Sequence, residues 1–196
     1  MTAVPARRLA IASDLLALDP EGAYEIHAGE IVEKAAPSGR HGASQSVVTG
    51  SLVPAFHRRA GGSGGPGGWW ILVEVEIELG PHDLIRPDLV GFRRDRVPLC
   101  PLDFPVRERP DWVCEVLSPS TMRRDLGPKR DLLHRAGVPH YWLVDPDAQV
   151  LTVLRHHPDG YLVAQVVGPG DRARLEPFEA IELEVGLLFG IEPEEE

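Results

Sequence analysis

The segment from Trp112 to Leu117, WVCEVL, places one carboxylate inside an otherwise apolar run. A short apolar run of this kind predicts a buried strand. A charged carboxylate in such a strand is costly to bury unless it is paired, protonated or bound to a cation. Glu115 therefore indicates either a buried ion pair or a functional site. The neighbouring segments help to distinguish these two interpretations.

Asp88 is the second acid in an unfavourable position. It follows Pro87 and opens the apolar segment 88–92, which predicts another strand. If both acids lie at the same end of neighbouring strands, their oxygens form a site suited to Mg²⁺ or Mn²⁺. A metal there could activate a water for phosphodiester hydrolysis. The alternative is that both acids are ion-paired with local arginines such as Arg86.

Lysine is rare in this chain, because only Lys34 and Lys129 stand among 20 basic residues. Lys129 follows Glu115 by 14 positions and falls in a helix that the pattern predicts around residues 126–136. From the first turn of that helix, its ammonium could reach both carboxylates and assist a phosphate or a water. The alternative is a solvated lysine on the helix surface.

The segments on either side predict a mixed α/β domain, with a central sheet flanked by helices. Strand patterns recur at 71–79, 88–92, 112–117 and 141–144. Hairpins are predicted at 24–33, as an N-terminal addition, and at 150–166; helices are predicted at 41–59, 126–136 and 186–189, with a first helix capped by Ser13. The Gly-rich stretch 61–68 predicts a flexible loop within one domain, 13–190, and 191–196 form an acidic tail.

Residues 71–79 alternate strictly between apolar and acidic residues over most of their length. On a single strand, this pattern places Glu74, Glu76 and Glu78 on one face. That face is expected to be solvated. One acid could still reach a metal from a neighbouring strand, and Glu76 is a secondary candidate for this role.

Composition limits the classes of function. The chain has 196 residues, 43% of them hydrophobic, which suits one α/β domain. Its net charge of −10 argues against a protein that coats nucleic acid, but residues 86–135 hold 11 Lys and Arg against 8 Asp and Glu. A basic centre in an acidic envelope favours a focused site for an anionic substrate, with scattered surface arginine as the alternative.

Several other functions are excluded by missing patterns. No apolar run is long enough to span a bilayer and no signal-peptide pattern is present, so we expect a cytoplasmic protein without membrane association. Cys100 and Cys114 are expected to be reduced thiols. The eight histidines show no zinc-ligand spacing, and the glycines form no phosphate-binding motif.

Four stretches together resemble the Uma2 family, also called DUF820: RPDLV at 86–90, CEVLSPST at 114–121, RRDLGPKR at 123–130 and AGVPHYWLVDP at 136–146. The segment AYEIHAGEIVEKAAPSGRHG, at 23–42, is similar to the family's first hairpin and helix start. Members of this family resemble restriction endonucleases of the PD-(D/E)XK superfamily. The resemblance implies that fold and a Mg²⁺-dependent endonuclease activity on nucleic acid, with DNA as the expected substrate.

Carried over residue by residue, the resemblance makes Asp88 the acid of the PD pair and Glu115 the acid of (D/E)XK, and both become expected metal ligands. The lysine expected two positions after Glu115 is replaced by Leu117, and Lys129 fits a lysine that the following helix supplies. Three further positions are similar to family-typical ones, namely Glu30, His41 and Asp125.

The leading interpretation is an endonuclease, but Leu117 keeps open a catalytically silent nuclease fold that serves as a binding or assembly module. A third interpretation is a structural oligomer whose acidic pocket only stabilises the sheet. The resemblance, and an aromatic strand at 141–142 near a sheet edge, predict a homodimer. In the enzyme, Asp88 and Glu115 should lie on adjacent strands within about 6 Å, with pKa values raised by desolvation and mutual repulsion.

Overall fold

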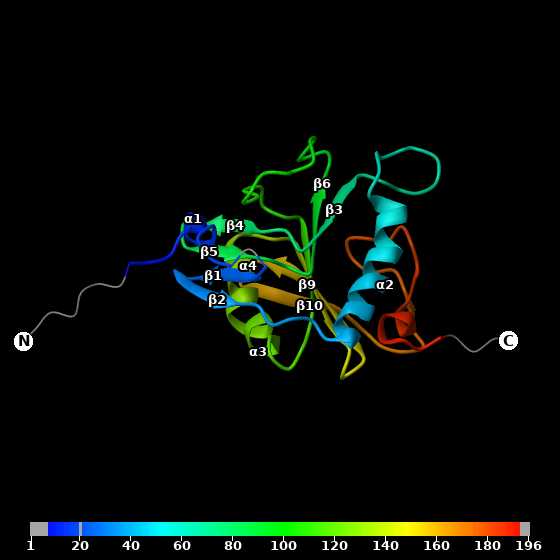
Figure 1. Ribbon diagram of the computed structural model, residues 1–196. Coiled ribbons are helices and arrows are strands. Elements are labelled where there is room, and N and C mark those ends of the chain that lie inside the picture. Colours follow the sequence, from blue (N-terminus) through cyan, green and yellow to red (C-terminus); the bar gives the residue numbers. More distant parts are fainter. Residues whose placement is uncertain (1–7, 20, 193–196) are drawn as a thin grey trace, which may run out of the picture.

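A six-stranded mixed sheet forms the centre of the protein (Figure 1). Its strands lie in the order β10-β9-β8-β7-β6-β3; β7 and β8 run parallel, and the other neighbours are antiparallel. The bounds are β3 Trp69–Val73, β6 Leu89–Arg93, β7 Trp112–Val116, β8 His140–Asp145, β9 Val150–His157 and β10 Gly160–Val167. The structure is a computed structural model that describes residues 8–19 and 21–192. The expected mixed central sheet is confirmed.

A helical crossover joins the two parallel strands, as their common direction requires. It contains α3 Met122–Arg124, the π-helical turn η1 Asp125–Lys129 and α4 Arg130–Arg135 in unbroken succession. The expected helix is present, but it begins at Met122, so the prediction that Lys129 lies in its first turn is wrong. Pro128 has no N–H to donate within the helix, which accounts for the local π-type turn.

A second, four-stranded antiparallel sheet contains the N-terminal hairpin, in the order β2-β1-β5-β4. The bounds are β1 Tyr24–His27, β2 Glu30–Glu33, β4 Ile77–Gly80 and β5 Asp83–Ile85. The predicted hairpin at 24–33 is confirmed. β5 was not expected from the sequence, because its three residues are too few to show a period.

The single strand predicted at 71–79 is wrong. The chain leaves the six-stranded sheet after Val73 and enters the four-stranded sheet at Ile77. Glu74, at the break, has a positive φ of 54°. Alternation describes each half locally, but it cannot show that the two halves belong to different sheets. The three glutamates of this stretch therefore do not share one face.

α2, Gly39–Phe56, packs against one face of the six-stranded sheet (Figure 1). Ser38 caps this helix, because its Oγ accepts a hydrogen bond from the backbone N–H of His41 at 3.2 Å. Val48 and Leu52 on the inner side of α2 are fully buried. The cap and the packed face together fix the first turn of α2, which carries His41.

The remaining short elements lie at the two ends of the described chain. α1 spans Ala12–Leu15, and the expected cap Ser13 lies inside it; the Asp14 carboxylate instead accepts the Ile11 N–H at 2.9 Å. At the other end are β11 Arg172–Ala173, β12 Leu183–Glu184 and the 3₁₀ helix η2 Val185–Phe189, which confirms the short helix predicted there. Residues 193–196 of the expected acidic tail lie outside the described residues.

The sheet order contradicts the expectation that the aromatic strand at 141–142 lies near a sheet edge, on which the homodimer was partly predicted. The strand that contains Tyr141 and Trp142 is β8, which is flanked by β7 and β9, and both side chains are fully buried. β3 and β10 are the edge strands instead.

Across residues 8–19 and 21–192, no helix combines the length and apolarity that a membrane crossing requires.

The Gly-rich stretch 61–68 joins α2 to β3, and its second half folds back onto the end of the helix. The Gly67 N–H donates to the Ala55 carbonyl at 3.0 Å, and the Gly68 N–H donates to the Arg58 carbonyl at 2.7 Å. Gly67 has a φ of +64°, and a Cβ there would collide with the backbone of Arg59, just after the end of α2. Glycine is therefore required at this return, where the chain approaches the helix closely.

Candidate functional site

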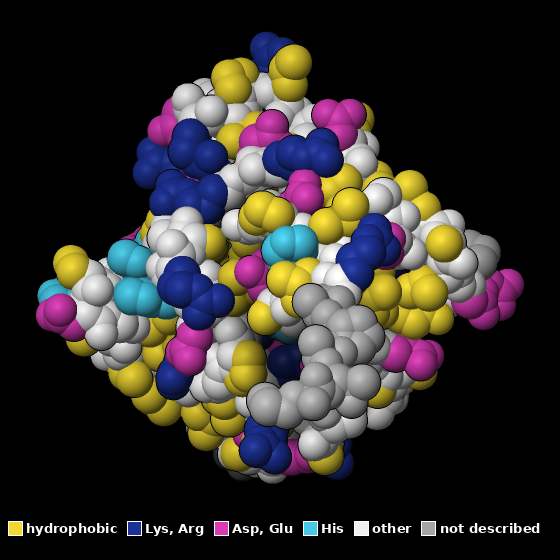
Figure 2. Space-filling model, turned by 90° about the vertical axis from the view of Figure 1, so that its left-hand side faces the viewer, with side chains coloured by type: hydrophobic (Ala, Val, Ile, Leu, Met, Phe, Trp, Pro, Cys, Tyr) yellow, Lys and Arg dark blue, Asp and Glu magenta, His cyan; other side chains and the backbone are white. Residues whose placement is uncertain are grey.

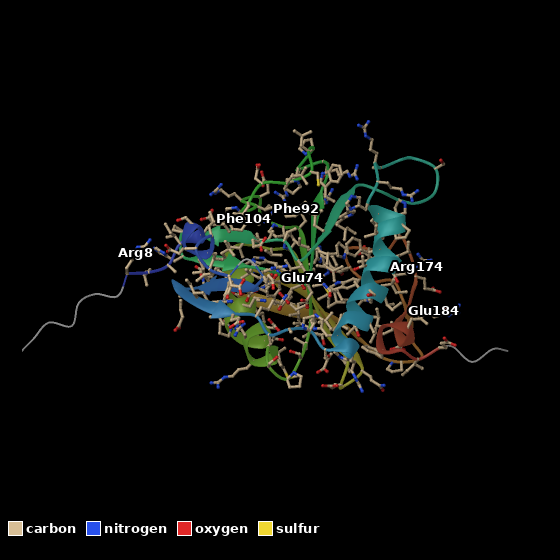
Figure 3. All side chains as sticks on the ribbon, in the orientation of Figure 1. Arg8, Glu74, Phe92, Phe104, Arg174 and Glu184 are labelled. Carbon is tan, nitrogen blue, oxygen red and sulfur yellow. The ribbon has the colours of Figure 1, made fainter. Side chains whose placement is uncertain are left out.

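One cavity of about 530 Å³ gathers most of the acidic and basic residues singled out above. It lies where the β1–β2 hairpin, the start of α2 and the ends of β6 and β7 meet, with η1 on the remaining side. Its ionisable lining side chains are Glu21, Glu25, Glu33, Lys34, His41, Glu74, Arg86, Asp88, Glu115, Arg124, Asp125 and Lys129. Figure 3 shows Glu74 near the middle of the molecule, between the hairpin and α2. A larger cavity of about 960 Å³ lies at the opposite end of β3 and β6 and holds none of these residues.

Asp88 is buried and is held by contacts from three other segments. Its Oδ2 accepts a hydrogen bond from the Val116 backbone N–H at 2.7 Å. Its Oδ1 accepts one from Lys34 Nζ at 2.7 Å and lies 3.3 Å from His41 Nε2. The carboxylate therefore links the hairpin, α2 and β7 at one point.

The two expected metal ligands line this cavity from neighbouring strands. β6 pairs antiparallel with β7, with Leu89 opposite Cys114. Asp88 precedes the first of these partners and Glu115 follows the second, so the two acids occupy opposed positions. Opposed residues of an antiparallel pair project from the same face of the sheet. The expected placement on adjacent strands is confirmed.

The pKa values of the two acids are shifted in opposite directions. Desolvation and the charges of Asp88 and Asp125 raise the pKa of Glu115 well above its usual value, against the opposing effect of Lys129. Desolvation would also raise the pKa of Asp88, but the contact with His41 and the charge of Lys34 outweigh it, so that this pKa is lowered. The prediction of two raised pKa values is thus confirmed for Glu115 and wrong for Asp88, because the contact with His41 and the charge of Lys34 favour the charged form of Asp88.

Lys129 is the centre of a buried ionic cluster. Its ammonium lies 2.8 Å from Glu115, 2.9 Å from Glu25 and 3.3 Å from Asp125, and its side chain is 2% exposed. Burial would lower the pKa of Lys129, but these three carboxylates raise it well above its usual value. The alternative of a solvated surface lysine is wrong.

The alternative pairing with Arg86 is also not what the structure shows. The Arg86 guanidinium lies 3.2 Å from Glu74 and 3.6 Å from Glu76. Lysines, rather than this arginine, make the ion pairs of Asp88 and Glu115.

Two ionisable residues that line the cavity, Glu25 and Lys34, were not among the site residues predicted from the sequence. Glu25 is fully buried in β1 and accepts hydrogen bonds from the Arg86 backbone N–H at 2.9 Å and from His27 Nε2 at 2.8 Å. The sequence could have indicated Glu25, because it is an acid within a short strand pattern, as Glu115 is. Lys34 was visible as the other rare lysine, but local periodicity does not show that the residue after β2 turns inward.

His41, Glu74 and Asp88 could together hold a metal ion, because each offers one ligand atom and these atoms lie within 4.8 Å of one another. His41 Nε2 is buried and makes no well-aligned hydrogen bond, which leaves its lone pair or proton without a firm partner. Carboxylate oxygens with one imidazole are a donor set that divalent cations accept. The residues present therefore fit a divalent metal.

The secondary candidates divide into two groups. His41 and Asp125 line the cavity. Glu30 is exposed at the start of β2, and Glu76 is bound to Arg86, and neither lines the cavity. Glu74, which the break after β3 turns inward, takes the place expected for Glu76.

Comparisons with known proteins agree with this fold. The chain matches the family model Uma2, described as "Putative restriction endonuclease", over residues 12–187. A similar solved structure is that of "a putative nuclease belonging to DUF820" from Anabaena variabilis, with a TM-score of 0.69 and 25% sequence identity, over 92% of this chain and 98% of that chain. No curated protein matches the chain. The family match and the solved structure support a nuclease.

Proposed function

This chain belongs to the Uma2 family, and we propose on that premise that it is a divalent-metal-dependent endonuclease that hydrolyses phosphodiester bonds, with DNA as its substrate. The observation that carries the proposal is the convergence of Asp88, Glu115, Glu74 and His41 in one cavity. Buried acids that converge on a cavity are expected where a cation must be bound.

Asp88 and Glu115 are the proposed ligands of Mg²⁺ or Mn²⁺, and His41 and Glu74 extend the donor set around Asp88. A bound divalent ion supplies an activated water and offsets negative charge on the phosphate. The protein's own contribution is to hold the carboxylates at a fixed place. The Val116 N–H fixes one oxygen of Asp88, and the Lys129 ammonium fixes one oxygen of Glu115.

Lys129 is proposed to act as the lysine that Leu117 does not provide. Leu117 is buried in the apolar core and carries no charge, so the cation must come from another segment. Lys129 contacts Glu115 directly at 2.8 Å, and its other two acidic partners hold it in place. This geometry supports a positioning role through Glu115.

A nucleic-acid substrate is supported by surface charge as well as by family. Lys and Arg side chains gather on the upper part of the face in Figure 2, at the height of the loop that joins β6 to β7. Exposed arginines in and beside this loop include Arg93 and Arg107. Cationic side chains on this surface would attract a polyanionic backbone even though the whole chain is acidic.

A homodimer is the proposed assembly, and the edge strand β10 is its proposed contact. Val163 and Val166 of β10 are 62% and 59% exposed. An open edge strand with exposed apolar side chains is normally covered. A second copy paired at this edge would supply a second site for cleavage of the second strand.

The metal site is tested by thermal unfolding with increasing Mg²⁺ or Mn²⁺. An ion at 100 times its dissociation constant stabilises a folded protein by about 2.7 kcal/mol, or roughly 5–10 °C in Tm for a chain of this size. We expect that rise in the unmodified protein and its loss in Asp88→Ala. If no divalent ion raises Tm, the catalytically silent alternative is favoured.

A further inference from the structure

Lys34 places a positive charge directly on the acids of the proposed metal site. Its Nζ donates to Asp88 Oδ1 at 2.7 Å and to the Arg86 carbonyl oxygen at 2.9 Å, and it lies 3.3 Å from Glu74 Oε2. The side chain is only 9% exposed. The three N–H groups of the ammonium thus have three acceptors, and two of them belong to the cluster that fits a metal.

A divalent ion and this ammonium cannot both occupy that place. A Mg²⁺ ion lies about 2.0–2.1 Å from its oxygen ligands. Lys34 Nζ already contacts the same Asp88 oxygen, so an ion on that oxygen would be close to a second positive charge. Repulsion at such a distance is large where water is largely excluded. One cation must move when the other binds.

Of the two lysines in the cavity, only Lys34 is free to make that movement. Lys129 is enclosed by three carboxylates and is 2% exposed. Lys34 follows the end of β2, lines the cavity wall and bears its ammonium on a flexible four-carbon stem. Lys34 forms its ion pairs with Asp88 and Glu74, the same acids that would coordinate a metal. A bound metal would therefore replace the ammonium as their counter-ion.

We propose that Lys34 is an exchangeable counter-ion of the metal site: it neutralises Asp88 and Glu74 while no metal is bound, and metal binding displaces its ammonium into the cavity, where it binds the phosphate of the substrate. This inference rests on the proposed function and adds a residue that neither the family position nor the (D/E)XK pattern supplies. Lys34 thereby lowers metal affinity and raises affinity for the anionic substrate.

The test is the metal affinity of Lys34→Met, measured by isothermal titration calorimetry with Mn²⁺ and with Mg²⁺. We expect the variant to bind the metal at least about tenfold more tightly than the unmodified protein, since no resident cation must leave. Lys34→Arg, which keeps the charge, should bind the metal no more tightly than the unmodified protein. Asp88→Ala should abolish metal binding, both as a single substitution and combined with Lys34→Met.

NMR of the lysine Nζ groups gives a second measurement, and the two lysines make it simple. On addition of metal, we expect the Lys34 signal to move and the Lys129 signal to move less. If the unmodified protein binds metal but Lys34→Met gains no affinity, or the Lys34 signal does not respond, the exchange is overturned and the metal site remains. If neither the unmodified protein nor Lys34→Met binds metal, the proposed function fails as well.

Discussion

Lys129 shares its ammonium with Glu25, Glu115 and Asp125 at distances of 2.8–3.3 Å. Removing one partner of a buried ionic cluster costs about 3–5 kcal/mol, because the remaining charges stay buried and unpaired. We therefore expect Lys129→Met to lower the free energy of unfolding by that amount, measured by denaturant titration. A solvated surface lysine, the alternative drawn from the sequence, would instead have left the free energy of unfolding nearly unchanged on this substitution.

The neighbouring Arg130 offers a matched control for this substitution. Its side chain is 45% exposed, and its ion pair is with the exposed Asp131. Arg130→Met should change the free energy of unfolding by less than about 0.5 kcal/mol. Equal losses in the two variants would show that the Lys129 cluster does not stabilise the fold.

The lowered pKa of Glu25 leads us to expect that the folded protein loses stability in acid. Desolvation opposes its ionisation, but the charge of Lys129 and the hydrogen bond with His27 outweigh it and lower the pKa of Glu25 below its usual value of 4.5. A carboxyl with a lowered folded-state pKa stabilises the fold above the unfolded-state pKa, and this contribution is lost as pH falls. Between about pH 5 and pH 3, Tm should fall more steeply in the unmodified protein than in Glu25→Gln. Parallel curves would contradict the charged state assigned to Glu25.

At the scale of single residues, the sequence identified Asp88, Glu115 and Lys129 by residue type against background. An acid in an apolar strand and a lysine among arginines are unusual enough to be noticed. The opposite pKa shifts of Asp88 and Glu115 were not predictable in this way. They depend on which side chain lies beside each acid, and Lys34 and His41 belong to segments that are distant from Asp88 in the chain.

The break between β3 and β4 gives the clearest prediction for a structural element. Glu74 is in the break and lines the cavity, whereas Glu78 lies in β4 and is bound to Arg107 at 2.7 Å. A single alternating strand would have made these two acids equivalent. We expect Glu74→Gln to weaken the metal-linked rise in Tm, because one donor of the cluster becomes neutral, and Glu78→Gln to leave that rise unchanged. The same loss in both variants would contradict the inward position of Glu74.

Elements with a complete local pattern were predictable, and elements defined by distant contacts were not. The hairpin at 24–33, the two strands β7 and β8 and the hairpin β9–β10 each hold enough alternating or apolar residues to show their period. The split of 71–79 and the π turn at Pro128 depend on where the chain changes sheet and on one missing N–H. Neither alters the local hydrophobic pattern.

For the whole molecule, the exposed edge of β10 predicts the oligomeric state. If two copies meet there, Val163→Glu should convert a dimer to a monomer, because it introduces a charge at a covered apolar edge. Leu102→Glu, in the β6–β7 loop, is the control: Leu102 is 83% exposed and lies away from that edge. Light scattering measures the mass. A monomer in the unmodified protein at high concentration would contradict the dimer.

The mixed sheet and its helices could be predicted because the Uma2 resemblance extends over nearly the whole chain and agrees with the local patterns. The division into a six-stranded and a four-stranded sheet could not, because strand order depends on long-range pairing. That division is what creates the cavity, since the hairpin carries Glu25 and Lys34 to the ends of β6 and β7.

The most direct test of the central claim is cleavage of nucleic acid by the purified protein in Mg²⁺ and in Mn²⁺, with supercoiled, linear and single-stranded DNA and RNA as substrates. We expect metal-dependent cleavage of DNA that a chelator stops, and a loss of roughly a thousandfold in Asp88→Ala, as removal of several kcal/mol of metal-based stabilisation requires. Glu78→Gln should retain the unmodified rate. Cleavage that persists in Asp88→Ala, or no cleavage of any substrate with either ion, would contradict the assignment of this cavity as a nuclease active site.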